Sequence, residues 1–393
     1  MVTASESSLA KFDGGMVSRM CEYGTVKIDT ADELGIRIAE ARELAGMTQA
    51  ELATMSDLGR TVIAKIEAGT RKVGAVELVR LAEALRRPVD WFFVESPPAV
   101  VSRRSDSNIR GLSAMLDARV DWIARDIAYL HQLGELPKYE RFVLPPPESV
   151  DGAAGAAGEL RCHLNLPDGP LHHLQALAER LGLFAFSLDI GADGGDAAYV
   201  AVEDAGVAVI NGKMDPGRRR FNLAHELGHH VFQDAYAPEI GLSPQDDTER
   251  LINAFAIHLL LPLGDARSLV EEFAPDVRLA AVAAGVRFRL SWTAVCAQVR
   301  NAGLADAGAY EDLAAQPPTR VDFLELGERW QPELEAPAVP PKYGRRVLSA
   351  YRRRKLTAER AAELLWDTLS VVELPDQVEL SAETYRREFG SEE

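Results

Sequence analysis

The chain has few cysteines and no long apolar run. Its 393 residues include only three cysteines, Cys21, Cys162 and Cys296, and their wide spacing excludes a disulfide framework or a cluster of thiolate ligands. No stretch approaches the roughly eighteen apolar residues of a membrane span, and the N-terminus lacks the basic-then-apolar run of a secretory signal. We therefore expect a soluble, cytoplasmic protein without membrane contact.

An excess of positive charge is also lacking. The formal net charge is −17, from 43 Lys and Arg against 60 Asp and Glu. Such a chain cannot coat nucleic acid non-specifically, because each neutralised phosphate needs a basic side chain nearby. Residues 33–92 are the exception, since their basic and acidic residues balance and the basic ones gather between Arg60 and Lys72. Any contact with DNA must therefore be local.

Hydrophobic periodicity and proline clusters divide the chain into several parts. A length of 393 residues exceeds what one core usually organises. Short helical repeats follow a leader without sustained periodicity, and Pro97-Pro98 and Pro145-Pro146-Pro147 mark breaks. We expect a multi-domain protein of α and α+β class, with these parts: flexible leader 1–31, all-α domain 32–96, helical linker 97–150, α+β domain 151–305 and helical C-terminal region 306–393.

The α+β domain is expected to alternate between helices and a small sheet. A strand is predicted over 183–190, and β-branched residues on both sides of a turn predict a hairpin of 198–202 with 207–210. We considered that the second hairpin strand offers a free edge to an extended substrate. Helices are predicted over these ranges: 171–181, 219–233, 248–261 and 265–273.

One helix of this domain carries His225-Glu226-Leu227-Gly228-His229. Residues four apart on a helix share a face, so both histidines can bind one tetrahedral metal ion. Glu226 points to one side, where its carboxylate can hold a water molecule and take its proton, as peptide hydrolysis by a zinc ion requires. The other interpretation is a pair of hydrogen-bonded core histidines. His230 and His258 are interpreted as packed or surface histidines.

Glu249 is the expected third ligand, because catalytic zinc takes three protein ligands and keeps one position open. It begins a second helical pattern in which Asn253 lies on the same face and can orient a metal-bound imidazole. Asp246 and Asp247 are nearby competitors, but neither has an amide or carboxylate four residues later. An exposed acidic residue at a helix start is the other interpretation of Glu249.

These two segments resemble the ImmA/IrrE metallopeptidases over roughly residues 155–305. Residues 220–229 are similar to that family's active helix, and 249–262 to its second signature, although Leu251 and Ile252 depart from the usual Glu and Ala. The resemblance implies a zincin-like fold, Zn²⁺ or another divalent cation, and cleavage of a specific DNA-binding repressor.

The all-α part contains a pattern suited to DNA. Thr48 and Glu51 form a capping box before one short helix, and the next helix runs from Arg60 to Gly69 with Ile63 and Ile66 inward. The outward side chains of that second helix suit the major groove, and others near it suit phosphates. The expected DNA contacts are Gln49, Arg60, Thr61, Lys65, Arg71 and Lys72.

Residues 35–93 resemble the Xre/Cro-type helix-turn-helix family. Two positions depart from its pattern: Asp57 stands where a turn glycine is common, and Gly59 stands where Ser usually begins the recognition helix. Both changes predict weaker DNA binding. A small helical module that binds protein is the other interpretation.

Together the two patterns predict a zinc-dependent HEXXH-type endopeptidase that regulates transcription. The expected partners are DNA, through residues 32–96, and a protein substrate that the second resemblance identifies as a transcriptional repressor. A homodimer is a further expectation. The alternative is a non-proteolytic helix-turn-helix regulator whose zincin-like domain senses a ligand or partner, although a sensor has no need of Glu226.

Overall fold

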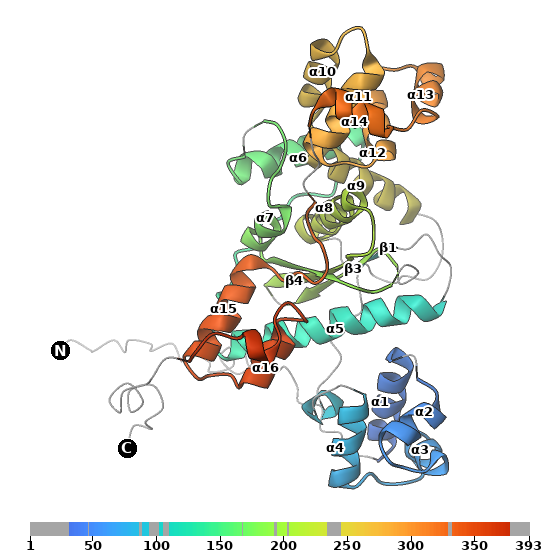
Figure 1. Ribbon diagram of the computed structural model, residues 1–393, viewed down its shortest axis with the longest axis vertical. Coiled ribbons are helices and arrows are strands. Elements are labelled where there is room, and N and C mark those ends of the chain that lie inside the picture. Colours follow the sequence, from blue (N-terminus) through green and yellow to red (C-terminus); the bar gives the residue numbers. More distant parts are fainter. Residues whose placement is uncertain are drawn as a thin grey trace, which may run out of the picture. The chain divides into compact units, whose positions relative to one another are not determined.

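The protein folds into two compact units, Met1–Ser96 and Pro97–Glu393. A computed structural model (Figure 1) describes ten stretches of the chain. The predicted leader lies outside them, apart from Ala31. The described stretches are 31–45, 47–85, 89–93, 102–104, 110–166, 168–191, 195–202, 204–233, 245–328 and 332–377.

The first unit is helical, as the sequence predicted. Apolar residues at helical spacing, among them Ile38, Leu52, Ile63, Ile66 and Leu81, are fully buried in one core. The capping box of Thr48 and Glu51 is present. The helices are α1 (Ala31–Leu44), α2 (Gln49–Met55), α3 (Arg60–Glu67), α4 (Ala75–Ala84) and the 3-10 helix η1 (Val89–Phe93).

Two positions in this unit show why particular residues stand there. A Cβ at Gly35 would lie 2.2 Å from the carbonyl oxygen of Ile66, so only glycine allows α1 to pack this closely on α3. Asp57 has a φ of 54°, which explains why a glycine suits that turn. Aspartate tolerates the left-handed region better than most residues, at some cost in free energy.

The second unit is built on a four-stranded sheet with the order β1-β3-β4-β2. The predicted hairpin is confirmed, because β3 and β4 pair antiparallel along their length. β2 pairs parallel with β4, and β1 pairs antiparallel with β3. The strands are β1 (Ser102–Arg104), β2 (Leu183–Leu188), β3 (Ala197–Val202) and β4 (Ala205–Asn211).

The free edge expected at residues 207–210 is wrong. These residues lie in β4, which is hydrogen-bonded to β3 on one side and to β2 on the other. Both neighbours are needed because β4 is buried on both faces, and a buried strand cannot leave its peptide groups unpaired. The sheet edges are β1 and β2.

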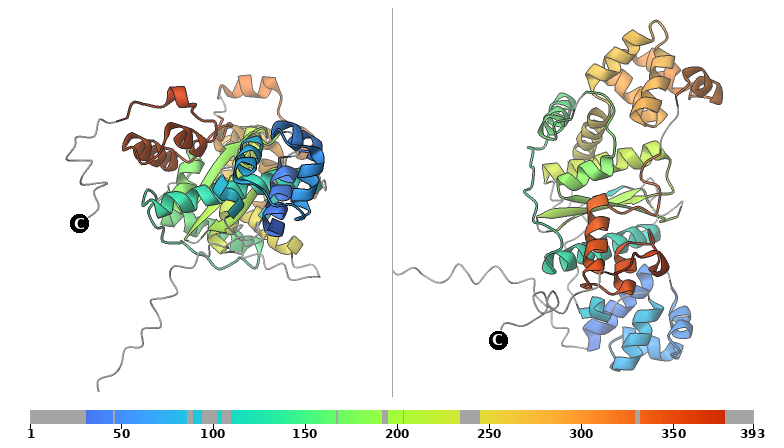
Figure 2. Two further views of the ribbon diagram at one scale, coloured as in Figure 1. Left: turned by 90° about the horizontal axis from the view of Figure 1, so that it is seen from below. Right: turned by 60° about the vertical axis from the view of Figure 1, so that its left-hand side comes forward.

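Helices cover both faces of the sheet, as the views of Figure 2 show. Alternate strand residues face opposite sides. Tyr199 and Ala208 belong to the core shared with α8 (Pro216–Phe232) and α9 (Gln245–Leu260), whereas Phe184 and Val207 belong to the core shared with α5 (Arg110–Gln132). Contacts within this unit run across the borders expected at residues 150 and 305.

The remaining helices pack around the sheet and the helices that cover it. α6 packs along α9, and α7 lies against β2. No single described helix is both long and apolar enough to cross a membrane; α11 and α12 pass that test only together, and they are bent by 118°. The ranges are α6 (Val150–His163), α7 (Leu174–Arg180), α10 (Leu263–Glu272), α11 (Val277–Phe288), α12 (Trp292–Asn301), α13 (Ala307–Ala314), α14 (Arg320–Leu326), α15 (Pro341–Arg352), α16 (Ala358–Leu364) and η2 (Val371–Glu373).

Candidate metal centre

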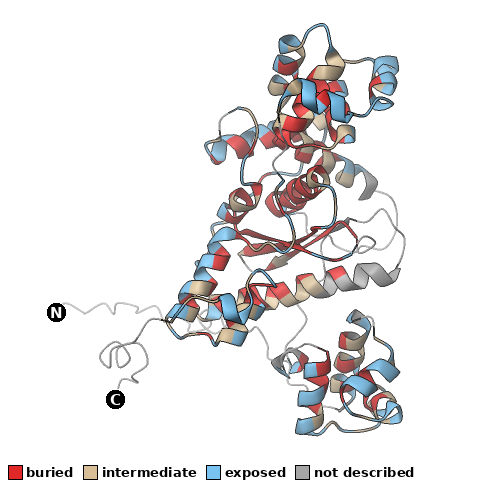
Figure 3. Ribbon diagram, viewed as in Figure 1, coloured by how far each residue is buried: buried red, intermediate tan, exposed pale blue. Residues whose placement is uncertain are grey.

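The centre is built on α8, which is buried almost throughout (Figure 3). Pro216 occupies the first turn, where its missing N–H costs nothing. At the other end Gln233 adopts the left-handed conformation that ends the helix. A helix buried on all sides needs a partner for every polar side chain it carries. His225, Glu226 and His229 therefore require an account of what they contact.

The packing of α8 on α9 brings the predicted residues together. A Cβ at Gly228 would lie 2.9 Å from Cγ2 of Ile252 and 3.1 Å from Cδ1 of Phe255. Glycine is thus the residue that lets the two helices approach this closely. Because Glu249 lies one turn before Ile252 on α9, the same approach carries Glu249 toward the histidines.

Three donor atoms converge where these helices meet. The Nε2 atoms of His225 and His229 are 3.1 Å apart. Glu249 Oε2 lies 3.3 Å from Nε2 of His225, and Glu249 Oε1 lies 3.6 Å from Nε2 of His229. All three donor groups fall within 4.8 Å of one another. The histidine side chains are 2% and 3% exposed, but Glu249 is 42% exposed, so the cluster opens to solvent on the α9 side.

Asn253 sets the protonation of one imidazole. Its Oδ1 lies 3.1 Å from Nδ1 of His225. An amide oxygen only accepts, so Nδ1 carries the proton and donates it to Asn253. The Nε2 of His225 then presents its lone pair toward His229 and Glu249, as a metal ligand must.

Glu226 is fully buried, and neither of its carboxylate oxygens has a hydrogen-bond partner within the described stretches. Burying a carboxyl group without partners is costly. Asn222, one turn earlier on α8, likewise has no hydrogen-bond partner for either amide atom among the described residues, so Glu226 is not alone on this helix, but it is the one of the two that directly follows a predicted metal ligand. Its partner must come from outside the described fold.

Strand β3 borders this cluster through Tyr199, a residue that the sequence analysis missed. Its ring stacks with that of His229, with centroids 6.5 Å apart and planes inclined by 13°. Burial raises the pKa of Tyr199, and the Glu226 carboxylate raises it further. No spacing in the sequence connects residue 199 with residue 229, because the hairpin alone brings them together.

The other nearby histidines have structural partners. His230 accepts from the Tyr199 hydroxyl at 3.1 Å and donates to the Leu181 carbonyl at 2.9 Å. Burial lowers its pKa to about 4, so the ring is neutral. His258 accepts from Gln298 Nε2 at 2.9 Å, and burial lowers its pKa too. Both are packed side chains, which agrees with their interpretation from the sequence.

The structure describes one of the two aspartates that compete with Glu249 as the third ligand. Asp247 is exposed and lies 3.4 Å from Arg250, on the solvent side of α9. The side chain of Asp246 lies outside the described residues. Among the side chains that are described, the cluster with metal-ligating geometry consists of His225, His229 and Glu249.

The donor set fits a zinc ion. Two imidazole nitrogens and one carboxylate oxygen are a ligand set that catalytic zinc takes, with one position left open. The Asn253 hydrogen bond fixes one imidazole in the tautomer that binding requires. The partnerless carboxyl of Glu226 follows His225 directly on the same helix.

The predicted DNA contacts in the first unit fall into two groups. Arg60, Thr61, Lys65 and Lys72 are exposed. Gln49 and Arg71 have partners inside the unit instead: Nε2 of Gln49 donates to Glu67 at 2.8 Å, and Nη2 of Arg71 donates to Glu77 at 2.7 Å. Glu67 also binds Arg42, at 2.6 Å. The exposed residues are therefore better placed for phosphates and bases than these two.

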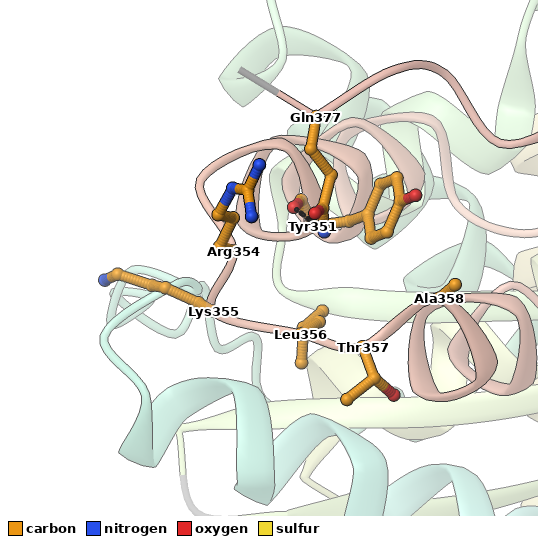
Figure 4. Close-up of a pocket in the computed structure, with 7 residues that line it drawn as sticks. All are labelled: Tyr351, Arg354, Lys355, Leu356, Thr357, Ala358 and Gln377. Carbon is orange, nitrogen blue, oxygen red and sulfur yellow. Dashed lines mark hydrogen bonds between the residues drawn. The ribbon is translucent and has the colours of Figure 1, made fainter. Parts of the chain in front are cut away.

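A pocket of about 400 Å³ lies at the turn between α15 and α16 (Figure 4). It is lined by Tyr351 and by two residues of the basic run 352–355, Arg354 and Lys355. Two of these basic residues, Arg353 and Lys355, pair with the buried Glu135. The run thus helps to attach the C-terminal helices to the end of α5, and none of the pocket's residues belongs to the metal centre.

Comparison with known proteins identifies both parts. Residues 38–92 match the family model of a helix-turn-helix, and residues 178–300 match that of the IrrE N-terminal-like domain, Peptidase_M78. No curated protein matches. Among solved structures, the restriction-modification controller protein C.AhdI from Aeromonas hydrophila is 33% identical, with 16% of this chain and 96% of that chain covered and a TM-score of 0.16. The chain thus carries one segment that is similar to a helix-turn-helix domain and another that is similar to the IrrE N-terminal-like domain of a peptidase family.

Proposed function

We propose that the chain is a zinc-dependent endopeptidase that regulates transcription by cutting a DNA-binding protein, such as a repressor. One observation carries the proposal: three metal-ligating groups converge beside a buried carboxyl group that has no partner in the described residues. A structural zinc site closes all four positions with protein ligands and needs no such group.

Each residue has a distinct task in this proposal. His225, His229 and Glu249 hold the metal, and Asn253 fixes the tautomer of His225. Zinc held by these residues would supply Lewis acidity for a substrate carbonyl and would lower the pKa of a water molecule toward neutrality. Glu226 orients the attacking water and accepts its proton at a carboxylate oxygen. It later delivers that proton to the leaving amine. Burial of α8 keeps bulk water from competing at Glu226.

An extended substrate segment would lie along β3. This strand borders the cluster through Tyr199 and contacts α8. Its outer side is paired in the described residues only over Ala197–Tyr199, with β1, whereas β4 is paired along its length on both sides. Addition of a strand to a sheet edge satisfies the substrate's peptide groups and holds its backbone straight for cleavage. Such binding requires a stretch of substrate without regular structure of its own, as found in linkers between domains.

The helix-turn-helix domain brings the peptidase to DNA or to a substrate that is bound there. Its helix α3 carries the exposed side chains of Arg60 and Thr61 at its start and of Lys65 in its last turn. The strong negative charge of the whole chain makes non-specific attachment weak, so contact depends on these few side chains. A homodimer is compatible with this arrangement but is not required by it, and sedimentation analysis tests it.

The alternative is a regulator that senses a ligand and cuts nothing. The partly exposed Glu249 favours access of a small ligand to the metal. A sensor, however, has no use for a buried carboxyl at residue 226. If the domain is a sensor, removal of zinc should change DNA binding, whereas Glu226→Gln should leave regulation of transcription intact.

The test is cleavage of DNA-binding proteins encoded beside this chain's gene, followed by mass spectrometry of the fragments. Glu226→Gln should reduce turnover by about 10²–10⁴-fold while the protein keeps its metal, because an amide cannot accept the proton. The exposed Glu271 provides a matched control, and Glu271→Gln should cut like the unaltered chain. Equal turnover in both variants would contradict the role of Glu226.

A further inference from the structure

The short strand β1 occupies the outer side of β3, next to the metal centre. Ser102 is paired with Tyr199, Arg103 with Ala198 and Arg104 with Ala197, all antiparallel. Tyr199 is the residue whose ring stacks on His229. β1 also contacts α8 itself. A segment of this chain therefore lies where an extended substrate would have to pair.

The opposite edge of the sheet offers no equivalent place. There, Ser187 of β2 exchanges two backbone hydrogen bonds with Ala338, each 2.9 Å long. The Ser187 hydroxyl also donates to the Leu334 carbonyl at 2.6 Å. The segment around Ala338 thus pairs with the β2 edge at Ser187, whereas the outer side of β3 lies on the strand that contacts α8 and borders the cluster through Tyr199.

We propose that β1 is a built-in competitor that holds the substrate-binding edge of β3 until an extended protein segment displaces it. The inference rests on the proposed function, because it takes that edge to be the place of the substrate. With three residues, β1 forms few hydrogen bonds, so a longer segment that pairs with all of β3 can replace it.

β1 is tethered on both sides by its own chain, since η1 precedes it and α5 follows it in the sequence. Only residues 94–101 separate the end of η1 at Phe93 from Ser102. A tethered segment competes at an effective concentration in the millimolar range, so a free peptide displaces it more readily when the tethered strand is weakened.

The experiment measures binding of a peptide to the full chain, without turnover. The probe is a fluorescein-labelled peptide with the sequence of residues 97–109, added to zinc-loaded and zinc-free protein carrying Glu226→Gln. Ser102→Pro and Arg103→Pro are compared in that background. Alternate residues of an antiparallel strand direct their N–H groups toward the neighbour, so one of the two changes removes a ladder hydrogen bond.

The affinity of the probe should rise about tenfold or more in at least one proline variant, by fluorescence anisotropy. A probe with proline at both positions should not bind. Unchanged affinity for the probe in both variants would overturn the proposed role of β1, even if the chain proves to be a peptidase. Conversely, probe binding without any cleavage of protein substrates would support the competitor and contradict the proposed function.

Folding is checked in the same samples. Slow hydrogen exchange of β4, which lies between β3 and β2, should persist in both variants. If proline unfolds the sheet, the double change Ser102→Gly and Arg103→Gly weakens the strand while it keeps both N–H groups. Probe binding to that variant should then rise, and absence of a rise would likewise overturn the proposal.

Discussion

Two buried glutamates beside the same sheet have opposite surroundings. Glu179 on α7 and Glu226 on α8 are both 0% exposed. The oxygens of Glu179 accept from the backbone N–H groups of Tyr343, at 2.6 Å, and Lys342, at 2.8 Å. Those of Glu226 have no partner in the described residues. The hydrogen bonds of Glu179 attach the start of α15 to α7. The carboxyl group of Glu226 has no such bonds and is available to a water molecule or another bound group.

The same contrast separates two arginines of the helix-turn-helix domain. Arg71 makes two hydrogen bonds to Glu77, of 2.7 and 3.2 Å. Arg60, at the start of α3, is exposed. A side chain that is already paired must give up its partner before it can contact DNA, and this cost reduces its net contribution. Chemical type alone does not reveal this difference.

The largest effect on stability is expected at Glu179. Glu179→Gln places an NH₂ group against one of two N–H donors, and should lower the free energy of unfolding by about 1–3 kcal/mol. Glu226→Gln breaks no bond among the described residues and removes a carboxyl group whose burial without partners is costly, so it should lower the free energy of unfolding by less than Glu179→Gln does. Urea unfolding of the metal-free protein checks both. A larger loss for Glu226→Gln would mean that its carboxyl has a structural partner.

DNA binding should distinguish the arginines by about tenfold. Arg60→Ala should weaken binding to a duplex selected from a random pool by about 1–3 kcal/mol and relax its sequence preference, if Arg60 contacts a base edge. Arg71→Ala should cost less, because Glu77 already holds that guanidinium. Electrophoretic mobility shifts at two salt concentrations measure both. The comparison fails if Arg71→Ala is the more damaging change.

The smallest effect is expected at Asp57. Its φ of 54° lies in the region that glycine adopts without strain. Its contact with Arg80, 3.4 Å long, is exposed and contributes little. Asp57→Gly should therefore raise the stability of the first unit by about 0.5 kcal/mol, as measured by thermal unfolding. A decrease would show that the Arg80 pair outweighs the backbone strain.

Much of the metal centre could be predicted from local sequence. His225 and His229 are four residues apart on one helix, so helical geometry alone places them together. Glu249 and Asn253 could be inferred because they repeat the same spacing on the next helix. Tyr199 could not, since its position depends on pairing between strands that are distant in sequence from α8.

The order of strands in the sheet could not be predicted from sequence patterns. Alternation of β-branched residues predicted the hairpin of β3 and β4, but neighbour order depends on long-range pairing that no local pattern encodes. For that reason β4 was mistaken for an edge strand. Likewise, the acidic partners of Gln49 and Arg71 lie 18 and 6 residues away, and only the packed helices reveal them.

Zinc content measured by mass spectrometry of the purified chain tests the account most directly. The unaltered chain should bind one zinc ion, and so should His163→Ala, which removes an exposed histidine stacked on Phe142. His225→Ala and His229→Ala should each lose the metal, because each removes one of three ligands. Stoichiometric zinc in both of these variants, or none in the unaltered chain, would contradict the proposed centre.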